Sequence, residues 1–485
     1  MSRANRVVAP RPPRPSSPTS PHPVGTRPPV FSPTHPEHNL SELIQDAREA
    51  ALDGDMGPPE PSDYHALRGR LEAARASLPP VYREAFYQPF LSALDGLGPM
   101  GFSQVLQSDP RREGTAALLL DVAHAILQNA EGYERVATDA FQEVVSDLYD
   151  GFLSAGDRRG VKPPDRGVIP PLVKWGNPSF GPYTWPVDAT SEVLGLEAGV
   201  VSLPPANARQ GLLAWAALPH EAAGHDVLHA DSGLAAELAW AVYARLKAED
   251  LEMLGEYWAE RIDETASDVL GILNMGPTAG LGLVGYFRGL NAAWGGEPRL
   301  RSEGPAGDSH PADLLRGYLA AATVSKLQFT GRQGWTRLIE QQVEEDRADV
   351  VLAGEPVSLE KARLSAGFVA EVIVTHRAAA LEGHALGQIQ NWRDADQTRV
   401  ARLSQRLLSG PPELPGALVE GTYAAHLVAA AIEAALVKGA AVRPIHARMV
   451  RLLKQMHDAN PSWGPLFIRH RGNAIPHRAY MPRKG

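Results

Sequence analysis

A short strand-like segment stands inside a chain whose remaining pattern is helical, and this contrast constrains the fold more than any other feature. Residues 160–205 are rich in Pro, Gly, aromatic and β-branched residues, and they contain three runs typical of strands at 173–175, 183–185 and 200–203. After residue 206, apolar residues recur at the three- and four-residue intervals of amphipathic helices. We therefore expect a mainly α fold with one small β-sheet placed just before a long helix.

Composition changes along the 485 residues indicate several regions, because a chain of this length exceeds one compact core. The expected regions are a Pro/Arg-rich tail over 1–38, an N-terminal helical region over 39–159, a central region over 160–350, a C-terminal helical region over 351–460 and a basic tail over 461–485. Residues 1–36 hold 11 of the 42 prolines and five Arg but no acidic residue, so we expect them to stay extended in solvent. The alternative is a docking segment for a partner protein.

Charge and residue usage exclude several classes of function. Lys and Arg total 47 against 56 Asp and Glu, and the net charge of −9 argues against a protein that coats nucleic acid. The absence of Cys excludes disulfide scaffolds, Cys-ligated zinc, iron–sulfur clusters and thiol catalysis. No signal peptide is visible, and the most apolar late stretch, 423–441, contains His426, Glu433 and Lys438. We therefore expect no membrane span and a cytoplasmic location.

The motif that carries chemistry is His220-Glu221-Ala222-Ala223-Gly224-His225, which is one residue longer than the His-Glu-x-x-His of zinc hydrolases. Residues five apart lie about 140° apart around a regular helix, so both imidazoles could not face one ion. A single-turn π-bulge would absorb the extra residue, and Gly224 would make that distortion easier. The alternative pair is His225 with His229, four apart on one face. Otherwise His229 is expected to support the site.

A zinc hydrolase needs a third protein ligand, and the downstream helix offers Glu264. Glu264 and Asp268 lie four apart on one helix face, so Glu264 could bind the metal while Asp268 accepts a hydrogen bond from a ligating imidazole. The 44 positions from His220 to Glu264 allow one helix to end and another to return antiparallel. His310, which precedes Pro311 at an expected helix start, would donate to the oxyanion of a tetrahedral intermediate.

These motifs resemble those of the gluzincin branch of zinc metallopeptidases. The segment from His220 to His225, together with Asp263-Glu264-Thr265-Ala266-Ser267-Asp268, is similar to the two motifs of dipeptidyl-peptidase III. The segment from Glu264 to Asp268, with Ser309-His310-Pro311 and Arg316, is similar to the later motifs of the prenyl-protein endopeptidase and related gluzincins. The resemblance covers roughly residues 195–320. It implies a zincin-like core flanked by helical regions, Zn²⁺ bound by His220, His225 and Glu264, Glu221 as general base, and His310 as a substrate or transition-state contact.

The expected substrate is a peptide or an unfolded protein. Zinc would acidify its bound water, and Glu221 would take a proton as that water attacks a peptide carbonyl. Aromatic side chains precede the motif on the expected strands, where an edge strand would pair with an extended peptide. Expected substrate contacts are Trp175, Tyr183, Trp185 and Arg316, with Phe180 in the same aromatic group.

Two other classes of function remain open from the residues alone. The chain could be a binding or assembly module that keeps the fold with an inactive site, although such a module has no need of Glu221 as a base. It could also be an oxygenase that holds iron with two His and one carboxylate. Glu221 beside the first His is surplus in that chemistry as well, so the sequence favours the zinc hydrolase.

Overall fold

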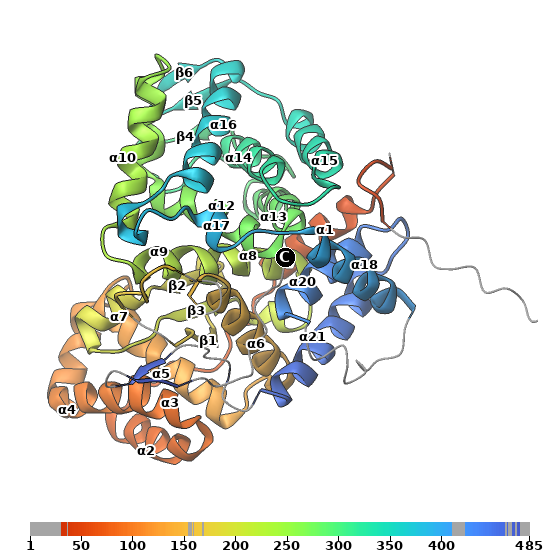
Figure 1. The fold of residues 1–485 in the computed structure, drawn as a ribbon. Coiled ribbons are helices and arrows are strands. Elements are labelled where there is room, and N and C mark those ends of the chain that lie inside the picture. The colour runs from red at the N-terminus through yellow and green to blue at the C-terminus, as the bar shows by residue number, and fades with distance from the viewer. Residues whose placement is uncertain are drawn as a thin grey trace, which may run out of the picture.

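The computed structural model describes residues 31–475 apart from 36, 154–157, 159, 167–168, 410–421, 461–462, 464–467 and 471–472. Residues 1–30 of the expected N-terminal tail and most of the expected basic tail over 461–485 therefore lie outside the described residues. The described chain is mainly helical with small mixed sheets, which confirms the expected fold class at that level (Figure 1).

The helices fall into three groups along the chain. Before the first sheet come α1 (Leu40–Ala51), α2 (Tyr64–Ala74), α3 (Pro80–Tyr82), α4 (Gln88–Ser108), α5 (Thr115–Glu131) and α6 (Arg135–Leu153). The central group is α7 (Val187–Leu194), α8 (Leu212–His220), α9 (Val227–Ala230), α10 (Leu234–Lys247), α11 (Glu252–Glu260), α12 (Ile262–Met275), α13 (Pro277–Trp294), α14 (Asp313–Ser325) and α15 (Arg332–Glu345). The last group is α16 (Leu359–Thr375), α17 (Leu386–Ile389), α18 (Asp394–Ser409), α20 (Ala424–Ala435) and α21 (Val442–Asp458).

Short helical turns of other types join these helices. The 3₁₀ turns are η1 (Arg75–Ser77), η3 (Pro178–Phe180), η4 (Pro205–Ala208) and η6 (Ala379–Leu381). Two segments of the described chain are π-helical, η2 (Arg83–Tyr87) and η5 (Glu221–Asp226).

The three predicted strand runs form one sheet. Its strands are β1 (Leu172–Trp175), β2 (Tyr183–Trp185) and β3 (Val200–Leu203), in the order β1-β3-β2. β3 pairs parallel with β1 and antiparallel with β2, so β2 is an edge strand. The described residues also form two sheets that were not expected. β4 (Glu303–Gly304), β5 (Val350–Leu352) and β6 (Glu355–Val357) form one, and β7 (Ile468–His470) pairs with β8 (Asn473–Ile475) in the other.

This first sheet separates two hydrophobic cores, because successive side chains of a strand point to opposite faces. Val173, Trp175 and Val201 belong to the larger core, which also contains α6, α8 and α12. Leu172 and Val200 belong to a smaller core built mainly from α2, α4 and α5. Figure 1 shows the sheet between these two groups of helices.

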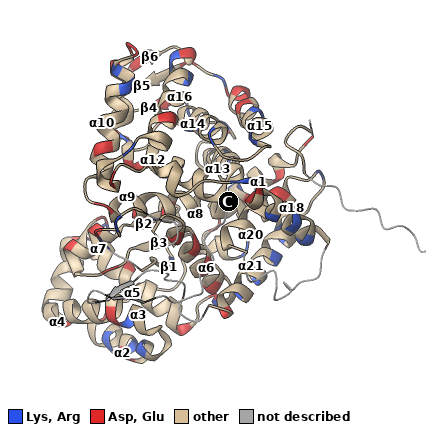
Figure 2. Cartoon of the chain, viewed as in Figure 1, with Lys and Arg blue, Asp and Glu red and all other residues tan. Residues whose placement is uncertain are grey.

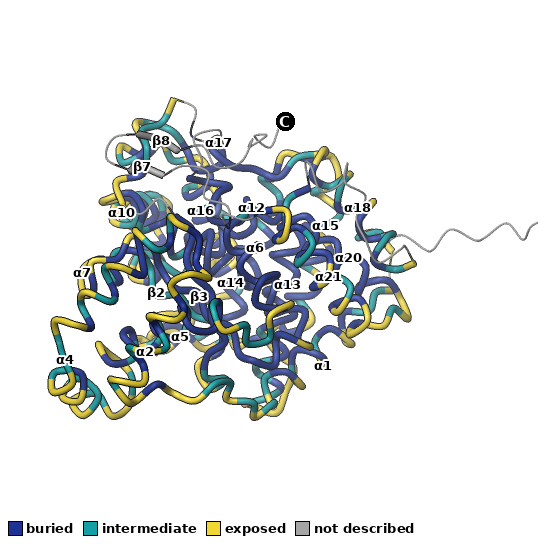
Figure 3. The backbone as a smooth tube through the Cα atoms, turned by 90° about the horizontal axis from the view of Figure 1, so that it is seen from below, coloured by how far each residue is buried: buried dark blue, intermediate teal, exposed yellow. Residues whose placement is uncertain are grey.

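One long continuous helix passes through the larger core. α8 continues without a break through η5 into α9, which confirms the expected long helix after the sheet. Buried chain gathers around this centre, and exposed chain lies mostly at the periphery (Figure 3). The larger core contains residues from Leu40 to Met456, so one apolar cluster draws on all three regions expected between the tails. The boundaries of those regions stay predictions.

Charged residues are spread over the outer helices in both signs (Figure 2). Arg is frequent on α18, which also begins with two Asp, and Asp and Glu are scattered among the other helices. None of the described helices has the length and apolar character that a membrane crossing requires.

Candidate metal centre

The two motif histidines meet because the helix changes type between them. His220 ends α8, and His225 lies in the π-helical segment η5 that follows directly. A π-turn accommodates one more residue than an α-turn, so residues five apart return to one side. The Nε2 atoms of His220 and His225 lie 3.1 Å apart. The π-bulge predicted from the motif spacing is therefore present.

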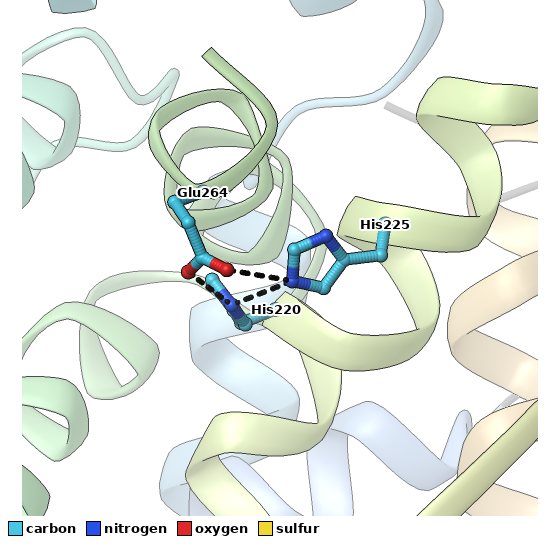
Figure 4. A group of neighbouring side chains, drawn as sticks. All are labelled: His220, His225 and Glu264. Atoms are coloured by element: carbon cyan, nitrogen blue, oxygen red, sulfur yellow. Dashed lines mark hydrogen bonds and ion pairs between the residues drawn. The ribbon is translucent and has the colours of Figure 1, made fainter. Parts of the chain in front are cut away.

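Glu264 completes the group from the neighbouring helix α12. Its Oε2 lies 3.3 Å from Nε2 of His220, and its Oε1 lies 3.5 Å from Nε2 of His225. Each of the three residues offers one ligand atom, and these atoms all lie within 4.8 Å of one another. Figure 4 shows the two imidazoles and the carboxylate converging on one point between the helices.

Two glycines let the helices approach closely enough for this convergence. A Cβ atom on Gly224 would lie 2.4 Å from Cβ and 2.6 Å from Cα of Ser267 on α12. A Cβ atom on Gly271 of α12 would lie 3.0 Å from the backbone nitrogen of His220. Gly224 has no positive φ. The structure thus assigns Gly224 to close packing against α12, whereas the sequence suggested an easier helix distortion.

Asp268 holds the imidazole of His220 from behind. Nδ1 of His220 donates to Oδ1 of Asp268 at 2.8 Å, which leaves Nε2 facing Glu264. Both carboxylate oxygens of Asp268 also accept from Arg316, with Nε and Nη2 each at 2.8 Å, and Asp268 is fully buried. Burial lowers the pKa of His220, but the hydrogen bonds to Asp268 and Glu264 outweigh it and raise that pKa to about 10.

A second chain of hydrogen bonds holds His225. Its Nδ1 lies 3.1 Å from Oδ2 of Asp263, whose Oδ1 lies 3.0 Å from Nε2 of His229. Nδ1 of His229 in turn lies 2.7 Å from Oδ2 of Asp188. Hydrogen bonds to Asp188 and Asp263 raise the pKa of His229 to about 10. His229 is therefore placed behind the ligand group, and the alternative pair of His225 with His229 does not form.

The residues present fit a zinc ion. Two imidazole nitrogens and one carboxylate oxygen are a ligand set of catalytic zinc, and a carboxylate behind each imidazole is the usual support for such ligands. Oε2 of Glu264 is buried, and among the described residues its charge is met by Nε2 of His220 at 3.3 Å and Nη2 of Arg316 at 3.6 Å, so a cation bound between the ligands would take the place of the imidazole proton. Burial raises the pKa of Glu264, but the nearby His220 and Arg316 hold it well below the ordinary value.

Glu221 faces the same cavity as the ligand group. The cavity has a volume of about 930 Å³ and is lined by His220, Glu221 and Glu264 among others. Oε2 of Glu221 accepts a hydrogen bond of 2.8 Å from Oγ1 of Thr184 on β2. Sequence reasoning missed Thr184, although its position between two strand aromatics places it on the opposite face from them.

His310 also lies at this cavity. Its Nε2 is 3.3 Å from Oε1 of Glu264, and its Nδ1 is 3.2 Å from Oδ1 of Asp308. Its side chain is 49% exposed, so it can reach a molecule in the cavity. The following helix α14 begins at Asp313 and not at Pro311, so His310 belongs to the preceding loop.

Of the aromatic residues expected to contact substrate, Trp175, Tyr183 and Trp185 do not face the metal cavity. Trp175 is 1% exposed, and its Nε1 donates to Oγ1 of Thr138 at 2.7 Å, so its indole belongs to the larger core and not to the cavity. Tyr183 and Trp185 point to the other face of the sheet, away from Thr184 and Glu221.

Arg316 lines the metal cavity, but its guanidinium is already engaged. It is buried, it binds Asp268 through two hydrogen bonds, and it lies over the ring of Phe287 at 4.5 Å from the centroid. These contacts place Arg316 behind the ligand group as a support for Asp268, in contrast to the expected substrate contact.

Comparison with known proteins assigns no family to this chain. No protein-family model, no curated protein and no solved structure matches it.

Proposed function

We propose that this chain is a zinc-dependent peptidase with a zincin-like core, in which His220, His225 and Glu264 hold the metal and Glu221 acts as general base. One observation carries the proposal: three zinc-type ligand atoms within 4.8 Å of one another share a cavity with a buried glutamate that is not needed as a ligand. A binding module would have no use for this extra carboxylate.

The residues of the chain divide the chemical work. A bound zinc ion supplies Lewis acidity, which lowers the pKa of a coordinated water and polarises a carbonyl. Glu221, oriented by the hydroxyl of Thr184, takes a proton from the attacking water and returns it to the leaving amine. His310 donates to the oxyanion from the cavity wall, and Asp268 fixes the tautomer and orientation of His220.

The edge strand β2 supports a peptide as the substrate. No described strand pairs with its second edge, so the backbone groups there can bind an extended chain. Helical segments surround the cavity, since its lining includes residues of α13, α14 and the loop after α15. Such walls favour short or unfolded substrates, and rapid cleavage of folded proteins would contradict this view.

Elemental analysis of the purified protein is the first test. We expect about one zinc per chain in the wild type and loss of that zinc in His220→Ala and in Glu264→Ala. A peptide library then tests activity, with Glu221→Gln as a matched control that should keep zinc and lose cleavage. Iron in place of zinc would favour the oxygenase, and no metal after zinc addition would favour the binding module.

A further inference from the structure

A second cavity lies on the other face of the small sheet. It has a volume of about 550 Å³ and is lined by residues of α5, of β1 and β2, and of the loop that follows α1. It is distinct from the metal cavity, yet Phe180 of η3 lines both. Phe180 is 53% exposed and therefore stands at the rim between the two cavities.

The polar groups at the base of this cavity satisfy one another. Asp121 pairs with Lys174, and its Oδ2 accepts from the hydroxyl of Tyr183 at 2.7 Å and from Nε1 of Trp185 at 2.8 Å. Nζ of Lys174 also donates to the hydroxyl of Tyr183 at 2.9 Å. This network leaves no unpaired charge at the base of the cavity.

Apolar groups form much of the remaining wall. They come from Met56, Pro58, Pro59, Ala117 and Phe180. Another pair of charged residues in the lining, Arg112 and Glu60, is also joined, with Nη2 and Oε1 2.8 Å apart. The remaining acidic residue of the lining, Glu113, is exposed to solvent. A charged guest would therefore lose its hydration for at most a solvated counter-charge, whereas a large apolar guest would be removed from water.

The edge strand β2 connects the two cavities. The side chain of Thr184 points to Glu221 on the metal side, and those of Tyr183 and Trp185 point to Asp121 in the second cavity. A peptide that pairs with the free edge of β2 would have the same alternation. The residue beside Thr184 would extend toward the metal cavity, and its immediate neighbours would extend toward the second cavity.

We propose that the second cavity is a specificity subsite that takes one large apolar side chain, such as Leu or Phe, from a peptide paired with β2. This inference rests on the proposed peptidase function, because it requires an extended peptide at the metal site. It defines the substrate class as peptides with a bulky apolar residue directly next to the residue that enters the metal cavity.

Binding of labelled peptides to the zinc-loaded Glu221→Gln variant tests the subsite without cleavage. The peptides are short Ala/Ser sequences with blocked ends, and each carries one test residue: Leu, Phe, Ala, Lys or Asp. The test residue is placed at each position of the peptide in turn. We expect Leu or Phe at the subsite position to bind at least about tenfold more tightly than Ala, and Lys and Asp to show no such gain.

Two variants link this preference to the cavity. Ala117→Trp fills the cavity from α5 and should abolish the preference. Ala130 is half-buried on the same helix but outside the lining, so Ala130→Trp should retain the preference. If Ala117→Trp does not fold, Met56→Ala removes an exposed wall residue and should weaken the preference.

The outcomes separate the two proposals. Cleavage by the zinc-loaded wild type without any apolar preference, or with a preference that both cavity variants retain, would overturn the subsite and leave the peptidase function intact. A wild type that binds zinc but neither binds nor cleaves peptides would overturn the peptidase function, and the subsite would fall with it.

Discussion

Replacing Gly224 with Ala tests whether close contact between η5 and α12 assembles the metal site. The added Cβ would lie 2.4 Å from Cβ of Ser267, while carbon atoms at optimal separation lie about 3.5–4.0 Å apart. Because the backbone Cα of Ser267 is also only 2.6 Å away, rotating a side chain cannot relieve the contact. The helices must therefore separate by about 1 Å. Glu264 stands one turn before Ser267 on α12, so it would move away from the two histidines.

Both stability and zinc binding should suffer. Overpacking of this kind costs about 1–3 kcal/mol without metal. Metal ligation tolerates deviations of only about 0.2 Å, so a shift of about 1 Å removes Glu264 as a ligand. A zinc concentration of a hundred times the wild-type Kd stabilises the wild type by about 2.7 kcal/mol, and we expect most of this gain to vanish in the variant.

Chelator competition gives the zinc Kd, and urea unfolding with EDTA or with zinc separates the two effects. Gly367→Ala on α16 is the matched control, since a Cβ there meets nothing within 4 Å and should stabilise the helix by about 0.5–1 kcal/mol. Adding Ser267→Gly to Gly224→Ala should restore zinc binding only in part, because the contact with Cα remains. A Gly224→Ala protein with wild-type stability and zinc affinity would refute the reasoning.

Three further predictions concern buried polar groups. Asp268→Asn should weaken zinc binding by about 10–100-fold in chelator competition, while Asp188→Asn, farther from the ligand group, should have a smaller effect; equal losses would contradict the assigned roles. Burial lowers the pKa of His446 to about 4, so the imidazole stays neutral in the folded protein while the unfolded chain takes up a proton below pH 6.5. The contribution of His446 to the free energy of unfolding is complete above pH 6.5 and falls by about 3 kcal/mol as the pH drops to about 4. In urea unfolding, the His446→Phe variant should lack this pH dependence. Burial raises the pKa of Glu433 to about 7, so its contribution to the free energy of unfolding is complete below pH 4.5 and is lost as the pH rises to about 7. Glu433→Gln should remove this loss of about 3 kcal/mol, which has the opposite pH dependence to that of His446. If the free energy of unfolding of either variant kept the pH dependence of the wild type, the buried residue would not be its cause.

Local patterns predicted the parts of the fold that local geometry determines. The three strand runs at 173–175, 183–185 and 200–203 correspond to β1, β2 and β3, because β-branched and aromatic residues between turn residues favour strands. The strands β4 and β6 consist largely of Glu, Gly and Pro, which do not favour strands, and β5 is a short apolar run that periodicity alone cannot distinguish from part of a helix. β5 and β6 pair as a tight hairpin, and only the pairing of β4 with β5 joins distant parts of the chain.

The candidate site was predictable where spacing fixes geometry. The extra residue between His220 and His225 implied the π-helical segment, and the interval of four from Glu264 to Asp268 implied a shared helix face. Which face a side chain points to was harder to predict. Trp175 lies in the core, and Arg316 binds a buried carboxylate, because tertiary packing and not the local pattern decides those contacts.

The sheet between the two cores has a consequence for cooperativity. Trp185 packs against the smaller core formed by α2, α4 and α5, while the adjacent Thr184 orients Glu221 at the metal site. Local unfolding of the smaller core would release β2, and with it the hydroxyl of Thr184 that positions Glu221. Substitutions that loosen residues 64–131 should then reduce turnover from a distance, and hydrogen exchange in β2 should follow the opening of the smaller core.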